Sequence, residues 1–171
     1  NYQPQVGDVS GDIIGRFLGW VRGASPMRPW LHIWGFFLFL GLSYVTAELL
    51  ARRMVAEVRA GGWGRSGRAW LLGVLLLIAV LAVLAALGRP TAALAALPLL
   101  LAVPLVLDRA AGPGRAFVGL LLVLGLGVVA GIELVYLRDF LEGGDWYRMN
   151  TLFKFSLPAW ILLGLAGGFT L

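Results

Sequence analysis

The sequence contains no cysteine, which excludes disulfides, cysteine-ligated metals and thiol nucleophiles. Charged residues are also scarce: they make up 13% of the 171 residues, whereas hydrophobic residues make up 60%. A soluble domain carries about 25% charged residues and alternates apolar with polar stretches. This composition is therefore that of a membrane protein.

Four long segments contain no charged residue and approach or reach the roughly 20 helical residues that cross a bilayer core. They are residues 69–88, 91–107, 116–132 and 155–171, and a fifth segment, 30–51, is interrupted only by His32 and Glu48 near its ends. Backbone groups in hydrocarbon must be bonded within their own segment, and period-two alternation is absent, so these segments are predicted to be helices. We predict an all-α, polytopic transmembrane bundle of about five spans, near residues 30–51, 69–88, 91–107, 116–137 and 152–171. It is expected to be a fragment of a larger membrane protein.

Residues 1–29 differ from the rest because they are polar and contain glycine and proline. Apolar side chains recur there at helical spacing, at Ile13, Ile14, Phe17, Leu18 and Val21. This pattern predicts an external segment with a short amphipathic helix lying at the membrane surface. The alternative is a loop that is ordered by other parts of the protein.

Two pairs of glycines have the spacing that lets membrane helices approach closely. Gly127 and Gly131 lie in the fourth span, and Gly164 and Gly168 lie in the fifth. Small residues four positions apart form such interfaces, so these faces are predicted to bring the last two spans together.

Basic residues outnumber acidic residues by fourteen to nine, and thirteen of the fourteen are arginine. No basic stretch has the interleaved aromatics that stack nucleic-acid bases, so nucleic acid is not expected as a partner. The densest group lies between the first two spans and comprises Arg52, Arg53, Arg59, Arg65 and Arg68. The positive-inside rule predicts that this loop is cytoplasmic.

The stretch RDFLEGGDWYRMNTLFKF, residues 138–155, gathers six charges and includes the only lysine of the chain. Just before it, Glu133 lies near the predicted end of the fourth span and would share one helical side with Tyr136 and Phe140. An ionisable residue at that depth marks a functional site unless it simply reaches into the headgroup region.

The start of the fifth span also favours an anionic partner. Asn150 or Thr151 is predicted to cap this helix, which puts Lys154 in the first turn, where a cation opposes the helix dipole. With Arg148 nearby and Glu133 and Asp139 across the turn, the pattern suits a phosphate or pyrophosphate, with or without a divalent metal. The alternative is an internal salt-bridge network that fastens the loop onto the bundle.

The motifs ELVYLRDF and RMNTLFKF, followed by Trp160, resemble the signature of the YYY-type family of large, uncharacterised polytopic membrane proteins of bacteria and archaea. That family is similar in organisation to the C-type membrane glycosyltransferases, which transfer sugars from polyprenyl phosphates at the outer face of the membrane. The resemblance implies a prokaryotic cytoplasmic-membrane protein with a polyprenyl-phosphate donor and a catalytic carboxylate upstream of Asn1. It departs from the family pattern at Ser156, Leu157 and Pro158.

The resemblance also assigns candidate roles to single residues. The candidate phosphate-binding residues are Arg138, Arg148, Asn150 and Lys154; the candidate acidic contacts, to a metal or an acceptor, are Glu133 and Asp139; the candidate walls for a sugar are Tyr136 and Trp146. The alternative is a non-catalytic membrane subunit or lipid-binding scaffold in which the same charges form a structural latch. Its partners would be membrane lipids and either the rest of a longer chain or other membrane subunits.

The arginine cluster generates a testable topology. The loop that contains Arg52 and Arg68 should be cytoplasmic, and residues 138–151 should be external. Single cysteines at Ser66 and Gly144 should react with a membrane-impermeant maleimide from opposite sides, with no background because the chain has no cysteine of its own. Reaction of both cysteines from one side would refute this topology.

Overall fold

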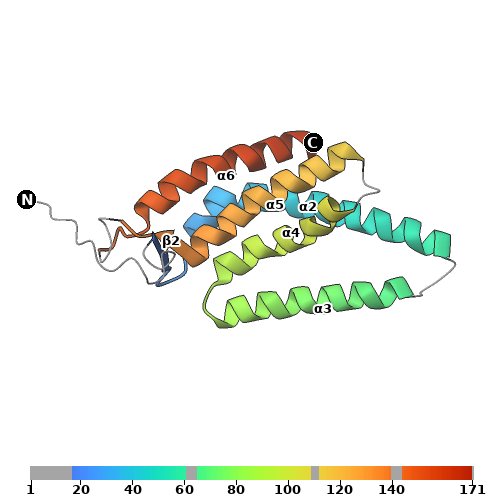
Figure 1. Ribbon diagram of the computed structural model, residues 1–171, viewed down its shortest axis with the longest axis horizontal. Coiled ribbons are helices and arrows are strands. Elements are labelled where there is room, and N and C mark those ends of the chain that lie inside the picture. Colours follow the sequence, from blue (N-terminus) through green and yellow to red (C-terminus); the bar gives the residue numbers. More distant parts are fainter. Residues whose placement is uncertain (1–16, 61–64, 109–111, 140–143, 171) are drawn as a thin grey trace, which may run out of the picture.

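The computed structural model describes residues 17–60, 65–108, 112–139 and 144–170. In these residues the chain forms five helices, which are α2 (Met27–Ala60), α3 (Arg65–Ala86), α4 (Pro90–Leu107), α5 (Pro113–Leu134) and α6 (Met149–Thr170). Two short strands, β1 (Leu18–Trp20) and β2 (Val135–Leu137), form an antiparallel ribbon. Figure 1 shows the helices aligned along the long axis with the ribbon at one end. The predicted helical bundle is confirmed, with the addition of this ribbon.

Within the part of the chain that the structure describes, four helices are long and apolar enough to cross a membrane: Met27–Arg52 of α2, Pro90–Leu107, Pro113–Leu134 and Met149–Thr170. The apolar part of α3, Trp70–Ala86, is shorter. Because α2 has 34 residues, it is about 51 Å long at 1.5 Å per residue, and its basic end extends beyond a bilayer core.

The turn between α3 and α4 is tight, as the sequence Gly-Arg-Pro indicates. Gly88 takes a φ of +70°, which closes α3, and Pro90 then opens α4 at a position that has no need of an N–H donor. Arg89 lies between them and is placed at the same end of the bundle as the ribbon.

Helix α5 is the centre of the bundle, because it packs against both α4 and α6. Close approach occurs where a glycine faces a large side chain: a Cβ on Gly125 would lie 2.7 Å from Leu163 of α6, and one on Gly119 would lie 3.1 Å from Leu105 of α4. The predicted small-residue pairs are not the contact, since Gly127 and Gly164 would have open space around a Cβ. Helix spacing alone could not tell which glycines face the neighbouring helix.

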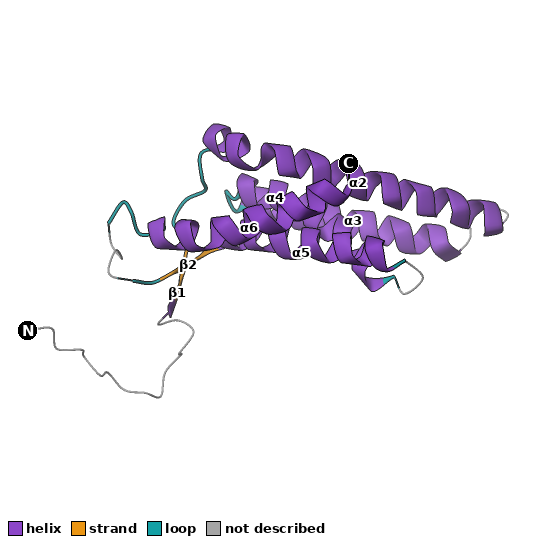
Figure 2. Cartoon of the chain, turned by 90° about the horizontal axis from the view of Figure 1, so that it is seen from above, coloured by secondary structure: helices purple, strands orange, loops and turns teal. Residues whose placement is uncertain are grey.

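Helices α2 and α6 meet through aromatic rings. Trp160 of α6 packs edge-on against Trp34 and Phe37 of α2, with ring centroids 6.4 and 5.2 Å apart. Viewed from above, α2 and α6 lie side by side over part of their length (Figure 2). Edge-to-face pairs of this kind add roughly 0.5–1.5 kcal/mol to the burial of the rings.

The ribbon corrects two sequence predictions. The fourth span was expected to continue as helix to residue 137, but α5 ends at Leu134 and Val135 is extended, with φ −128° and ψ 152°. The amphipathic helix was expected to include Leu18 and Val21, but Leu18 lies in β1; Ile13 and Ile14 lie outside the described residues. The reason is mutual pairing: Val21 N–H donates to the Leu134 carbonyl and Arg138 N–H donates to the Phe17 carbonyl, so each segment completes the backbone bonds of the other.

At the end of the bundle opposite the ribbon, an ion-pair cluster joins α2 to the loop after α4 and to α5. Arg52 Nη1 donates to Asp108 at 2.5 Å, and Arg52 Nε lies 3.9 Å from Glu48, which also contacts Arg115 at 3.4 Å. Residues 52–68 were predicted as a cytoplasmic loop, but α2 continues to Ala60 and α3 begins at Arg65, so the arginines of this segment lie in helices. The segment begins at one end of the bundle, and residues 144–148 lie at the other end.

The Arg52–Asp108 pair should contribute measurably to stability. Because the two side chains are 23% and 38% exposed, we expect a coupling of only about 0.5–1 kcal/mol between Arg52→Met and Asp108→Asn. The measurement is a double-mutant cycle of unfolding in detergent. Strictly additive losses would show that the pair does not hold α2 to α4.

Candidate functional site

Glu133, in the last turn of α5, is 1% exposed and accepts four hydrogen bonds. Its Oε1 accepts from the Ser25 hydroxyl at 2.8 Å and from Arg148 Nη2 at 3.1 Å. Its Oε2 accepts from the Thr91 hydroxyl at 2.7 Å and from the Ser25 backbone N–H at 3.3 Å. The carboxylate thus ties α5 to the loop before α2, to the start of α4 and to the start of α6.

The Arg148 side chain is also largely buried and is hydrogen-bonded within the protein. Besides Glu133, it donates to the Ser25 hydroxyl at 3.3 Å and to the Ile132 carbonyl, and its side chain is only 12% exposed. We call Glu133, Arg148, Ser25 and Thr91 the charge latch. For Glu133 and Arg148, the sequence left open either a phosphate site or an internal salt-bridge network. The charge latch is a network of the second kind.

The latch leaves Glu133 unsuited to hold a metal, because both of its oxygens are already used by donors from the protein. The described residues contain no group of three or more His, Asp or Glu side chains that could bind an ion. The divalent metal considered from the sequence therefore has no ligand set in the described part of the chain.

The other polar candidates lie apart from the latch. Asn150 Nδ2 donates to Asp139 Oδ2 at 2.6 Å, which ties the first turn of α6 to the end of β2. The Arg138 backbone is held in the ribbon. Lys154 is exposed on α6, and no ion pair joins it to Glu133 or Asp139 among the residues described.

Neither predicted cap acts as one. Helix α6 begins at Met149, before both residues; the Asn150 side chain turns to Asp139, and Thr151 Oγ1 accepts the Leu137 N–H at 2.9 Å. Thr151 therefore satisfies the open edge of β2. A residue that looks like a cap in the sequence serves the ribbon, because the ribbon brings an unpaired donor to it.

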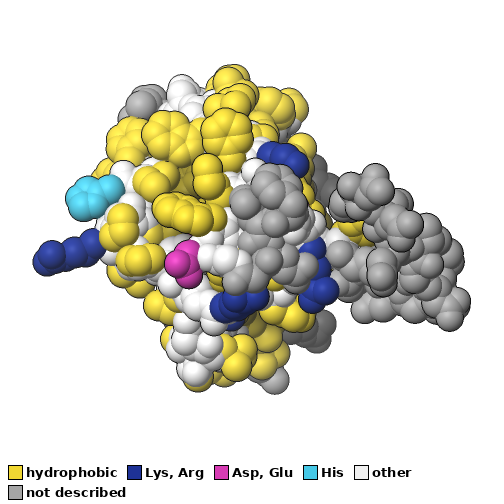
Figure 3. All heavy atoms as spheres, turned by 90° about the vertical axis from the view of Figure 1, so that its left-hand side faces the viewer, with side chains coloured by type: hydrophobic (Ala, Val, Ile, Leu, Met, Phe, Trp, Pro, Cys, Tyr) yellow, Lys and Arg dark blue, Asp and Glu magenta, His cyan; other side chains and the backbone are white. Residues whose placement is uncertain are grey.

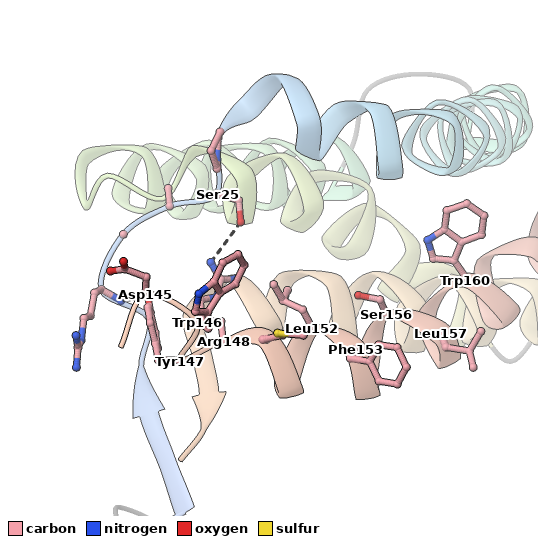
Figure 4. Close-up of a pocket in the computed structure, with 15 residues that line it drawn as sticks. Ser25, Asp145, Trp146, Tyr147, Arg148, Leu152, Phe153, Ser156, Leu157 and Trp160 are labelled. Atoms are coloured by element: carbon pink, nitrogen blue, oxygen red, sulfur yellow. Dashed lines mark hydrogen bonds between the residues drawn. The ribbon is translucent and has the colours of Figure 1, made fainter. Parts of the chain in front are cut away.

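An open groove of about 1000 Å³ lies between the loop of residues 22–26 and the first three turns of α6. Figure 4 shows Trp146 and Arg148 at the loop end and Leu152, Phe153, Leu157 and Trp160 following one another along α6. Its lining residues are Arg22, Gly23, Ala24, Ser25, Pro26, Asp145, Trp146, Tyr147, Arg148, Met149, Leu152, Phe153, Ser156, Leu157 and Trp160. We call it the α6 groove. Figure 3 looks onto this end of the molecule, where hydrophobic side chains form much of the visible surface and basic side chains lie at several separate points.

The groove contains some of the predicted residues and omits others. Arg148 and Trp146 line it, whereas Asn150 and Lys154 are not among its lining residues. Tyr136 does not line the groove. Its ring packs against that of Tyr147, which does line it, with the two centroids 4.7 Å apart.

Sequence reasoning missed Arg22, Ser25 and Thr91. Ser25 and Arg22 lie in a segment whose path depends on the ribbon, so no local signal identifies them. Thr91 could have been found from the sequence. It lies at the start of the span after the Gly88 turn, and in a chain of alternating spans this start lies at the same end of the bundle as Glu133.

Comparison with models of known protein families matches residues 10–163 to the family described as "Uncharacterized membrane protein (DUF2298)". The chain belongs to the DUF2298 family. It is therefore an integral membrane protein, and the expected membership of an uncharacterised membrane family is confirmed. No curated protein and no solved structure matches the chain.

The charge latch makes a stability prediction. Removing one partner of a buried ion pair leaves the other charge uncompensated, so Glu133→Gln and Arg148→Gln should each destabilise by roughly 3–5 kcal/mol. The double variant should lose less than the sum, since no buried charge remains.

The measurement is thermal unfolding in detergent, and Lys154→Gln serves as the matched control because that exposed cation has no ion pair in the described residues. If Lys154→Gln costs as much as Arg148→Gln, the latch is not the stabilising element at this end of the bundle.

Proposed function

We propose that this DUF2298 protein binds a lipid with an anionic head, a polyprenyl-phosphate-linked sugar, in the α6 groove. The groove would be the donor site of a glycosyltransferase-like enzyme at the outer face of a prokaryotic cytoplasmic membrane. One observation carries the proposal: a single groove combines cationic side chains at the loop end with an apolar wall that runs along a membrane span.

The apolar wall suits a lipid chain. Met149, Phe153 and Trp160 lie on one side of α6 over about 16 Å, at 1.5 Å per residue. Phe153 is 83% exposed, so this wall is open on the outer surface of a helix that is long and apolar enough to cross a membrane. A lipid can enter sideways from the membrane without crossing a polar barrier.

The polar end suits a phosphate. Arg22 and Arg148 line the groove where α6 begins, at the end of its predicted membrane span. This is the depth at which a lipid phosphate lies when its chain occupies the span. Guanidinium groups stabilise charge that develops on a leaving phosphate, which is the contribution proposed for this end of the groove. The base for transfer is not assigned to any described residue.

The charge latch favours a second candidate function, a non-catalytic subunit or lipid-binding scaffold of a larger membrane assembly. Glu133 and Arg148 form a largely buried ion pair, so their charges have a structural use that needs no substrate. A scaffold would still bind lipid in the groove but would transfer no sugar.

Filling the groove tests the proposal. Ser156→Trp places a large side chain in the groove, whereas Leu165→Trp adds the same side chain on an exposed part of α6 outside it. The affinity for farnesyl phosphate, measured by titration calorimetry in detergent, should fall about tenfold or more in Ser156→Trp. It should stay unchanged in Leu165→Trp.

Equal affinity in the parent protein and both variants would show that the lipid binds elsewhere, and the proposed function would be wrong. Farnesyl phosphate binding in the groove without sugar release from a polyprenyl-phosphate sugar, measured on the full-length protein, would instead support the scaffold.

A further inference from the structure

The α6 groove has two cationic lining residues, and they differ in availability. We infer that Arg22, rather than Arg148 or Lys154, is the residue that holds the lipid phosphate. This inference rests on the proposed function and assigns its anion contact to a residue outside the 138–155 stretch.

The other cations at this end of the bundle either form hydrogen bonds with protein groups or lie outside the groove. Arg148 spends its Nη groups on Glu133, Ser25 and the Ile132 carbonyl, and Arg89 donates to the Val21 carbonyl. Arg28, Arg89, Arg138 and Lys154 are not among the lining residues of the groove. Arg22 lines the groove, is exposed, and has no ion pair within the described ranges.

Arg22 is held in place by Tyr147 without being neutralised. Its backbone N–H donates to the Tyr147 hydroxyl at 3.0 Å, and its guanidinium carbon lies 5.1 Å from the centroid of the same ring. Stacking engages one face of a guanidinium and leaves its N–H donors, which lie in the plane at the edge, free for an oxyanion. The arrangement orients a phosphate donor and retains its charge.

A column of packed groups fixes the position of Tyr147. Its ring meets the buried Tyr136 of β2, and the Tyr136 ring in turn lies over Gly19 of β1. A Cβ at Gly19 would lie 2.5 Å from that ring, so only glycine permits this contact. The ribbon thereby determines where Arg22 lies.

The backbone on both sides of Arg22 is also fixed. Val21 N–H donates to the Leu134 carbonyl, and Ser25 donates to Glu133 through its backbone N–H and its hydroxyl. A ligand that binds Arg22 therefore orders little additional chain, which lowers the entropic cost of binding.

The test compares Arg22→Gln with Arg28→Gln, an exposed arginine at the start of α2 that does not line the groove. Loss of a charge-assisted contact should weaken farnesyl phosphate binding about 10- to 100-fold in Arg22→Gln and leave farnesol binding unchanged. Arg28→Gln should match the parent for both ligands. Arg22→Lys should recover part of the affinity, because a point charge replaces the planar donor.

Gly19→Ala tests the positioning column. Displacing Tyr136 should weaken farnesyl phosphate binding but not farnesol binding, whereas general damage to the fold would weaken both and lower the melting temperature. Farnesyl phosphate affinity that falls in Ser156→Trp but is unchanged in Arg22→Gln would overturn this inference and leave the proposed function intact. Affinity that is unchanged in both variants would overturn both.

Discussion

A carboxylate buried at a helix end in a membrane protein is the constraint on which this end of the molecule depends. Removing Glu133 from water costs several kcal/mol, roughly, unless donors and a counter-charge replace the lost hydration. Helix α5 cannot supply them, because its own N–H groups are used along the helix. The donors come from Ser25, Thr91 and Arg148, on three other segments. Satisfying one carboxylate therefore determines how four segments of the chain meet.

The ribbon and the groove follow from that convergence. Once Ser25 is held at Glu133, the residues before it must cross the end of α5, where Leu134 and Val135 still have open backbone groups. Pairing β1 with β2 satisfies those groups, and the α6 groove forms between the same loop and α6. The position of the groove is thus a consequence of backbone hydrogen bonding and charge burial, while its lining residues determine what can bind.

The sequence predicts the bundle well because hydrophobic length alone decides where spans lie. It does not predict the end of α5: Val135, Tyr136 and Leu137 continue an apolar helical pattern, and the choice of strand depends on β1, more than a hundred residues away. The sequence predicts that Glu133 is an unusual ionisable residue, and it leaves open which of the nearby basic residues pairs with it. Arg148 and Lys154 are both basic and six positions apart, and only the start of α6 at Met149 decides which one turns inward.

Polar contacts near both ends of the membrane-crossing part of α2, Met27–Arg52, have a further consequence for the groove. Hydrocarbon packing discriminates poorly between helix registers in a membrane, because lipid chains are as apolar as leucine side chains. Helix α2 is held by Glu48 and Arg52 at one end and by the loop containing Ser25 at the other. Trp160 packs against Trp34 and Phe37 between these ends. The groove runs from the Ser25 loop to Trp160, so both of its ends lie where α2 is held by these contacts. The register of α2 along the groove is therefore set by the hydrogen bonds from Ser25 to the buried Glu133 and by the aromatic contacts of Trp160.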